Sequence, residues 1–212
     1  MDEPNSAIPF GRQIDRLLVL ASASPRRSEI LTEAAIPFEI QISSVEELMR
    51  AGEPPADLAE RLAREKSLAV SGRLPEAPAR PVLGADTIVV VGEDVLGKPR
   101  DEEHAVELLM RLVGTTHRVM TGVAVSWTDG RGAFSRVVTS RVEMRPARRD
   151  ELVDYVAVGE SLDKAGGYAL QGEGRRFILG VEGSRTNVIG LPLEETVELL
   201  AEAGVPEEWI RS

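Results

Sequence analysis

The chain has 212 residues, and its 25 Lys and Arg against 35 Asp and Glu give a formal net charge of −10. The absence of cysteine excludes disulfides, thiolate nucleophiles and cysteine-ligated metal sites, and the two histidines, His104 and His117, are too far apart in sequence for a typical histidine metal site. The acidic balance argues against a broad basic face for DNA or RNA, although a local cluster of Lys and Arg can still hold a small anion.

The apolar pattern predicts strands and helices in alternation along the chain. In the first half it predicts strands at 17–21, 38–42 and 82–91, helices at 25–34 and 55–70, and a proline-rich loop at 74–81. In the second half it predicts a helix from the N-cap Asp101 to Leu112, a hairpin of 119–127 with 134–144, a strand at 176–179, and helices at 148–158 and 193–203. This order, with its antiparallel hairpin, favours an α/β fold around a mixed sheet.

The domain organisation is expected to be simple. Residues 1–15 are predicted to be a loose extension, 16–203 a single domain and 204–212 a short polar tail. Residues 1–14 contain no apolar run long enough for a signal peptide or a membrane span, so we expect a cytoplasmic protein without membrane partners.

The first chemically unusual segment, Ser22 to Ser28, lies where a strand turns into a helix. Ser24 is the predicted N-cap and Pro25 the first helical residue, which is a typical design for an anion-binding loop. Arg26 and Arg27 in the first turn oppose the helix dipole, and a bound phosphate would offset that cost. The alternative is that both arginines pair with surface acids. If they serve only the ligand, replacing Arg27 by Glu leaves the free protein at least as stable.

Asp86 is the second unusual residue, because it interrupts the apolar run 82–91. A buried carboxylate costs several kcal/mol unless it meets a cation, a metal or hydrogen-bond donors. Asp86 can therefore serve as a general base or as a ligand of a divalent cation. The alternative is that Asp86 caps a strand that stops at Gly84.

Further along the chain are weaker signals for a nucleotide. Lys66 and Lys98 lie near element ends and can reach a phosphate as point charges, although most such lysines are only solvated. The glycine-rich stretch 163–172 contains Gln171, whose amide can read a base edge, although surface loops often have this composition. The common phosphate-loop and dinucleotide-binding signatures are absent from the sequence.

Five strings together resemble a known family: residues 20–27 (LASASPRR), 83–87 (LGADT), 97–100 (GKPR), 163–168 (DKAGGY) and 187–192 (NVIGLP). They occur in the order and approximate spacing of the Maf family of septum-formation-associated nucleoside triphosphate pyrophosphatases. The resemblance covers about residues 16–203. It implies a mixed twisted sheet flanked by helices, with two lobes around a central active-site cleft, similar to the inosine triphosphate pyrophosphatases. It also implies a homodimer.

The resemblance further implies a reaction and a set of site residues. The sequence is similar to the branch that converts dTTP and UTP to the monophosphate and pyrophosphate, through Thr87, Lys164, Tyr168 and Gln171. By this resemblance Asp86 is the catalytic acid–base residue. The resemblance implies that Ser22, Arg27, Lys66 and Lys98 lie around the triphosphate. It implies that Arg26, Thr87 and Gln171 bear on base choice. It also implies that Glu39 is an acid near the metal.

The implied chemistry needs a water in line with the α-phosphorus, a base, and cations near the leaving pyrophosphate. Mg²⁺ or Mn²⁺ is the expected cofactor, since hard cations prefer oxygen ligands. Two alternatives stay open at this point: a nucleotide-sensing regulator of division with little turnover, and a pyrophosphatase for modified purine triphosphates.

Overall fold

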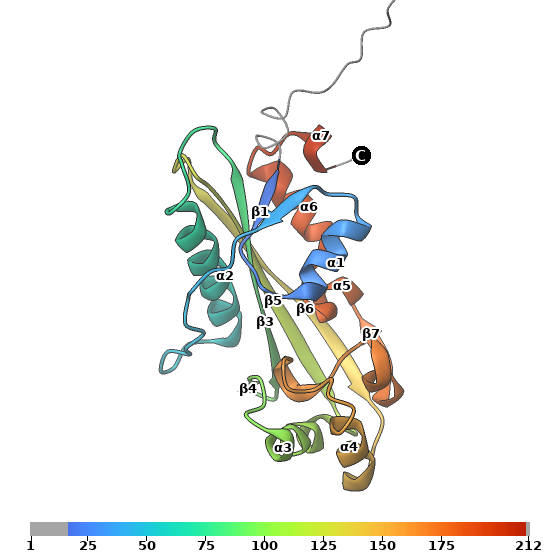
Figure 1. Cartoon of the computed structure of the whole chain (residues 1–212). Helices are drawn as coiled ribbons and strands as arrows, with labels where there is room; N and C mark the ends of the chain where they lie inside the picture. Colours follow the sequence, from blue (N-terminus) through green and yellow to red (C-terminus); the bar gives the residue numbers. More distant parts are fainter. Residues whose placement is uncertain (1–16, 211–212) are drawn as a thin grey trace, which may run out of the picture.

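The computed structural model describes residues 17–210 (Figure 1). Within these residues one seven-stranded mixed sheet runs through the molecule. Its strands lie in the order β2 (Phe38–Ile40), β1 (Leu18–Leu20), β3 (Pro81–Val91), β5 (Thr116–Trp127), β6 (Ala133–Met144) and β7 (Ile178–Glu182), with β4 (Asp94–Leu96) paired to β3. The pairs β1–β2 and β1–β3 are parallel, and the remaining pairs are antiparallel. The predicted α/β fold with a mixed sheet is confirmed.

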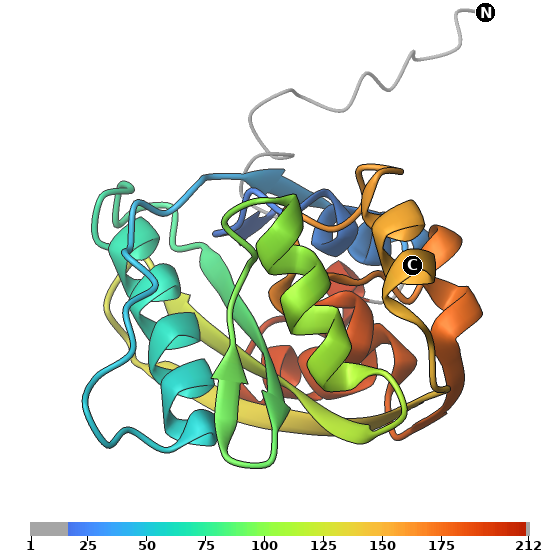
Figure 2. The same ribbon diagram turned by 90° about the horizontal axis from the view of Figure 1, so that it is seen from below.

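Helices cover both faces of this sheet. They are α1 (Pro25–Glu33), α2 (Pro55–Ser71), α3 (Glu102–Leu112), α4 (Arg149–Val156), α5 (Arg185–Ile189), α6 (Leu193–Glu202) and α7 (Glu207–Ile210), with two 3₁₀ segments at Ala165–Gly167 and Gly172–Phe177. In Figure 1, α2 lies on one side of the long strands and α1, α5 and α6 lie on the other. The helices α3 and α4 cover the end of the sheet at which β3 ends and β5 begins. The β3–β4 hairpin lies between α2 and α3 (Figure 2).

Side-chain alternation along β3 decides which helix each site residue can reach. Ile88 and Val90 pack against α2, whereas Leu83 and Ala85 pack in the core on the α1 and α6 side. Because successive strand residues point to opposite faces, Asp86 faces α2 and Thr87 faces α1.

The helix α2 approaches the sheet unusually closely at two glycines. A Cβ on Gly84 would lie 2.3 Å from the carbonyl oxygen of Ala63, and one on Gly122 would lie 2.1 Å from that of Ala59. Gly122 is the register partner of Asp86 on the neighbouring strand. The two glycines therefore let the α2 backbone pack directly on the sheet beside Asp86.

Most predicted elements agree with the structure within a few residues, and the Asp101 side chain caps α3 by accepting from the His104 N–H at 2.8 Å. The C-terminal segment differs from the expected tail. Val205 and Ile210 are buried in the same core as α1 and α6, so the described part of this segment belongs to the domain. The predicted extension 1–15 lies outside the described residues.

Candidate active site

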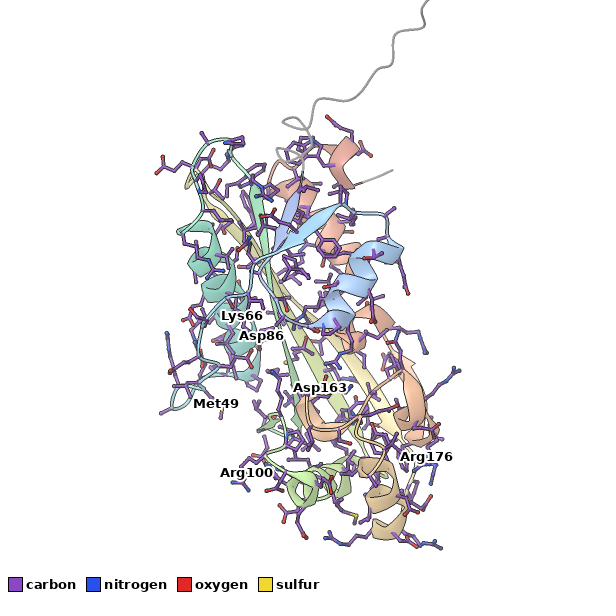
Figure 3. The ribbon with its side chains drawn as sticks, in the orientation of Figure 1. Met49, Lys66, Asp86, Arg100, Asp163 and Arg176 are labelled. Atoms are coloured by element: carbon purple, nitrogen blue, oxygen red, sulfur yellow. The ribbon has the colours of Figure 1, made fainter. Side chains whose placement is uncertain are left out.

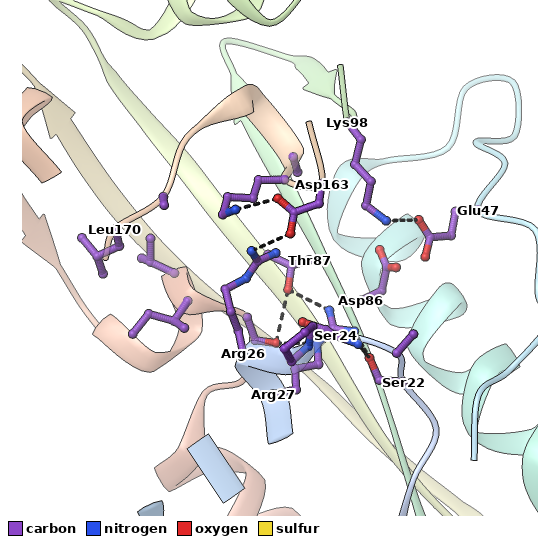
Figure 4. Close-up of a pocket in the computed structure, with 18 of the residues that line it drawn as sticks. Ser22, Ser24, Arg26, Arg27, Glu47, Asp86, Thr87, Lys98, Asp163 and Leu170 are labelled. Carbon is purple, nitrogen blue, oxygen red and sulfur yellow. Dashed lines mark hydrogen bonds and ion pairs between the residues drawn. The ribbon is translucent and has the colours of Figure 1, made fainter. Parts of the chain in front are cut away.

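A cavity of about 600 Å³ lies where the start of α1, Lys66 of α2 and the middle of β3 meet the segments 42–47, 160–172 and 188–190. Figure 3 shows Lys66 of α2 next to Asp86 of β3 in the middle of the molecule, and Figure 4 shows the cavity lining. The structure gathers nearly all of the predicted site residues here: Ser22, Arg26, Arg27, Lys66, Asp86, Thr87, Lys98, Lys164 and Gln171.

Arg27 forms the buried floor of the cavity. Its Nε donates to the Gly190 carbonyl at 2.8 Å, its Nη1 to Ser22 Oγ at 2.9 Å and its Nη2 to Thr87 Oγ1 at 3.2 Å. Burial lowers the pKa of Arg27, and the nearby Asp86 partly offsets that effect. Arg27 thus joins three separate segments, so it has a structural role in addition to any contact with a ligand.

Thr87 belongs to the same buried network. Its Oγ1 lies 2.9 Å from Thr121 Oγ1 and 3.4 Å from the Gly190 carbonyl oxygen, in addition to its contact with Arg27. A hydroxyl has one proton and two lone pairs, so these neighbours occupy its capacity. Any effect of Thr87 on base choice must therefore act through the placement of Arg27.

Arg26 points the other way, toward Asp163 (Figure 4). Its Nη1 lies 3.1 Å from Asp163 Oδ2, and Lys164 Nζ donates to Asp163 Oδ1 at 2.6 Å and to the Glu160 carbonyl at 2.5 Å. Burial raises the pKa of Asp163, but the hydrogen bond and charge of Lys164 outweigh it, so the net pKa is lowered. Asp163 is thus a charged partner shared by two of the cavity's cations.

The opposite wall holds a second ionic cluster. Lys66 Nζ lies 2.5 Å from Asp86 Oδ1 and 2.5 Å from Glu47 Oε1, and Lys98 Nζ lies 3.5 Å from Glu47 Oε2. Asp86 and Lys66 are both nearly buried, at 7 % side-chain exposure each. Partial burial raises the pKa of Glu47, but Lys66 and Lys98 together outweigh it and the net pKa is lowered. Glu47 and Asp86 therefore face one ammonium from two sides.

The 160–172 loop closes the cavity from the third side. Gln171 lines the cavity, is exposed, and has no hydrogen-bond partner among residues 17–210, so its amide is available to a ligand. Tyr168 is buried at the base of this loop, with its Oη 2.7 Å from Nε2 of the buried His117. This pair anchors the loop on β5.

Comparisons with known proteins identify the family of this chain. A family model described as Maf-like protein matches residues 17–203. This chain belongs to the Maf family. A dTTP/UTP pyrophosphatase of Myxococcus xanthus is 50 % identical over 91 % of the chain and 95 % of that protein. Another dTTP/UTP pyrophosphatase, of Anaeromyxobacter sp., is 49 % identical over 91 % and 92 %.

Among solved structures, a nucleoside triphosphatase described as a dITP/XTP pyrophosphatase of Mycobacterium abscessus matches at a TM-score of 0.40 and 14 % identity. The match covers 90 % of the Maf chain and 98 % of that chain. Similarity at this level says nothing about the site residues.

The one predicted site residue that the structure does not bring to the cavity is Glu39. Its Oε1 accepts from Arg80 Nη1 at 2.8 Å, and Glu39 is absent from the cavity lining. Val19 pairs with both Glu39 and Val82, so Glu39 lies level with a residue four positions before Asp86 on β3. That offset is roughly 13 Å along the strand. The prediction of Glu39 as a metal ligand is therefore wrong for this Maf protein.

Glu47 is the carboxylate that the structure places there instead. It lies in the segment 41–54, which has no helix or strand, so hydrophobic periodicity gives no signal for it. Glu47 reaches the cavity by pairing with Lys66, which lies 19 residues further along the chain in α2. An acidic pair, Glu46 and Glu47, ahead of a Gly-Glu-Pro-Pro turn was the only available hint in the sequence.

The charge of the lining and its donor set bear on a metal ion. Five cations face four carboxylates, namely Arg26, Arg27, Lys66, Lys98 and Lys164 against Glu47, Asp86, Glu160 and Asp163. This near balance cannot by itself neutralise a triphosphate. No group of three or more metal-ligating side chains occurs in the described part of the chain. Glu47 and Asp86 form an oxygen-donor pair, which suits Mg²⁺ or Mn²⁺ when phosphate oxygens complete the shell.

Proposed function

We propose that this Maf protein hydrolyses dTTP and UTP to the monophosphate and pyrophosphate. One observation carries the proposal: the nearly buried carboxylate of Asp86 shares a cavity with four cationic side chains besides Arg27. These four are Arg26, Lys66, Lys98 and Lys164. The names of its relatives, at 49 % and 50 % identity over about nine-tenths of the chain, support the pyrimidine substrates.

In the proposed reaction, water attacks the α-phosphorus and the bond from it to the bridging oxygen of the β-phosphate breaks. Asp86 orients the water and accepts its proton. Arg26, Lys98 and Lys164 bind phosphate oxygens and offset the charge that develops on the leaving pyrophosphate. Arg27 holds the loop of Ser22 and the middle of β3 in place, so that the site residues on both are positioned before the substrate arrives.

Glu47 and Asp86 are the residues that would hold Mg²⁺ or Mn²⁺ in this site. When bound, such an ion supplies positive charge that polarises the phosphoryl group and neutralises the leaving group. The support is the oxygen-only donor pair and the small net charge of the cavity lining. A hydrolysis assay with and without chelator tests the requirement.

Base choice is proposed to lie with Gln171. A side-chain amide offers one acceptor and two donors, which complements the carbonyl and N–H groups along the edge of uracil or thymine. Sites built around such bonds reject bases that leave buried polar groups unpaired. Arg26, on the same wall as Gln171, would contact the base or the α-phosphate at the cavity mouth.

Pyrophosphate release from purified protein with dTTP, UTP and a panel of purine triphosphates tests this function. We expect monophosphate and pyrophosphate as products, with the highest kcat/KM for the two pyrimidine substrates. Tight nucleotide binding with no pyrophosphate release would favour the nucleotide-sensing regulator. Faster release from modified purine triphosphates than from dTTP and UTP would favour a pyrophosphatase for modified purine triphosphates. Formation of diphosphate and phosphate would contradict the proposed bond cleavage.

We also propose that the protein is a homodimer, as the family resemblance implies, and that it is cytoplasmic, as the lack of a long apolar run in residues 1–14 suggests. Light scattering on purified protein tests the oligomeric state, and fractionation of cells tests the location. No helix in residues 17–210 is both long and apolar enough to span a bilayer.

A further inference from the structure

Lys66 occupies an unusual position for a residue that is expected to bind phosphate. Its ammonium lies within hydrogen-bond distance of both Asp86 and Glu47, the two carboxylates that face the cavity on this side. The side chain of Lys66 is only 7 % exposed. The charge of Lys66 is thus already satisfied inside the protein, in the place between two carboxylates where a divalent cation would sit.

We propose that Lys66 is an internal counter-ion that competes with the divalent cation for Asp86 and Glu47, and that it moves to the phosphates when cation and nucleotide bind together. The inference rests on the proposed function for the nature of the ligands. It makes binding of the cation and binding of the triphosphate interdependent, each weak alone and stronger together.

The physical reason is the cost of unpaired buried charge. If Lys66 left without a replacement, two carboxylates that are held close together would repel each other in a partly desolvated site. If a cation entered without a phosphate, the ammonium of Lys66 would lose both partners at once. Each event becomes favourable when the other occurs, and coupling between two ligands must be reciprocal.

Lysine suits this exchange better than arginine would. Its ammonium is a point charge on a flexible four-carbon stem, so it can turn from carboxylate to phosphate without moving the backbone. The stem starts from the middle of α2, which packs against the sheet through Gly84 and Gly122 and is therefore a fixed base.

Glu47 is also held in place, although its segment lacks regular structure. Arg61 of α2 donates to Glu53 Oε1 at 2.6 Å and to the Leu48 carbonyl at 2.8 Å, on either side of the turn that follows Glu47. The two carboxylates therefore stay near each other when the ammonium moves away.

Lys98 provides a matched comparison. Within the described part of the chain its ammonium pairs with Glu47 alone, at 3.5 Å, and its side chain is 57 % exposed. It carries the same charge as Lys66 on the same wall of the cavity, but it does not lie between the carboxylates. Loss of Lys98 should therefore weaken phosphate binding without freeing a cation site.

The test is a calorimetric titration of Mn²⁺ into the full-length protein without nucleotide. We expect Lys66→Met and Lys66→Gln to bind Mn²⁺ more tightly than the parent, by a factor in the usual range of coupling, roughly 5–150-fold. Lys98→Met should bind Mn²⁺ as the parent does. The double variant Lys66→Met, Asp86→Asn should lose the gain, which places the added affinity at Asp86.

Thermal unfolding gives a second readout on the same variants. Both Lys66 variants should melt below the parent without metal and gain more from Mn²⁺ than the parent gains. Mn²⁺ affinity equal to that of the parent, or a variant that Mn²⁺ does not stabilise, would overturn the inference. Because no nucleotide is present, a failure of dTTP or UTP hydrolysis would overturn the proposed function and leave this result standing.

Discussion

At the scale of single residues, Asp86 and Arg27 show two different uses of a buried charge. Asp86 faces the cavity with one partner that can leave, whereas Arg27 is held by three fixed acceptors. A charge that can lose its partner is available to a ligand. A charge with each of its three nitrogens bonded to the protein is part of the scaffold that the ligand meets.

The first prediction concerns Asp86→Asn. The amide keeps the shape but removes the proton acceptor and one charge beside Lys66, so turnover should fall by ~10²–10⁴-fold. Initial rates of pyrophosphate release from dTTP measure the effect. Asp94→Asn is the control and should keep the parent rate, since Asp94 lies on the surface of β4 and, among the residues that the structure describes, its side chain pairs with Arg111 alone. A fully active Asp86→Asn would make Asp86 a structural residue.

The second prediction separates the two neighbouring arginines. Arg27→Met removes three hydrogen bonds from a charged donor, to Ser22, Thr87 and the Gly190 carbonyl, and each such bond contributes about 1.5–3 kcal/mol. Arg26→Met removes only the partly exposed pair with Asp163, worth about 0–1 kcal/mol.

Urea unfolding and kcat/KM, measured on both variants, test this separation. Arg27→Met should lose stability and activity together. Arg26→Met should keep its unfolding midpoint and lose kcat/KM. If both variants unfold like the parent, Arg27 does not hold the three segments together.

At the scale of elements, the active-site geometry depends on how closely α2 approaches β3. The nearest atoms to a Cβ on Gly84 belong mainly to the α2 backbone, which cannot rotate away as a side chain can. Lys66 and Ser67 lie in α2 next to this contact, so a displaced helix moves the ammonium of Lys66 relative to Asp86.

We therefore predict that Gly84→Ala costs about 1–3 kcal/mol of unfolding free energy through overpacking. It should also lower kcat more than a surface change does, because Lys66 and Asp86 separate. Gly180→Ala is the matched control, since a Cβ there meets nothing within 4 Å. Equal stability and activity of the two variants would show that α2 can shift at no cost.

At the scale of the whole molecule, the sequence predicts what depends on local pattern. The hairpin of β5 and β6, the N-cap of α3 and the anomaly of Asp86 in an apolar strand are all visible from neighbours in the chain. Glu47 and the network of Arg27 are not, because their partners are 19 and up to 163 residues away. Glu39 was misplaced for the same reason, since its partner Arg80 lies 41 residues away.

The last prediction concerns the pH dependence of global stability. His117 is buried, its Nε2 is paired with Tyr168, and its Nδ1 has no hydrogen-bond partner among residues 17–210. Burial lowers the pKa of His117 from 6.5 to about 4. Between these values the unfolded chain takes up a proton that the folded protein does not, so stability is present above pH 6.5 and is lost as the pH falls toward 4. The loss is about 3 kcal/mol. Urea unfolding at several pH values should show this slope in the parent and in His104→Gln, and a flatter slope in His117→Gln. The same slope in all three proteins would mean that other groups control the acid sensitivity.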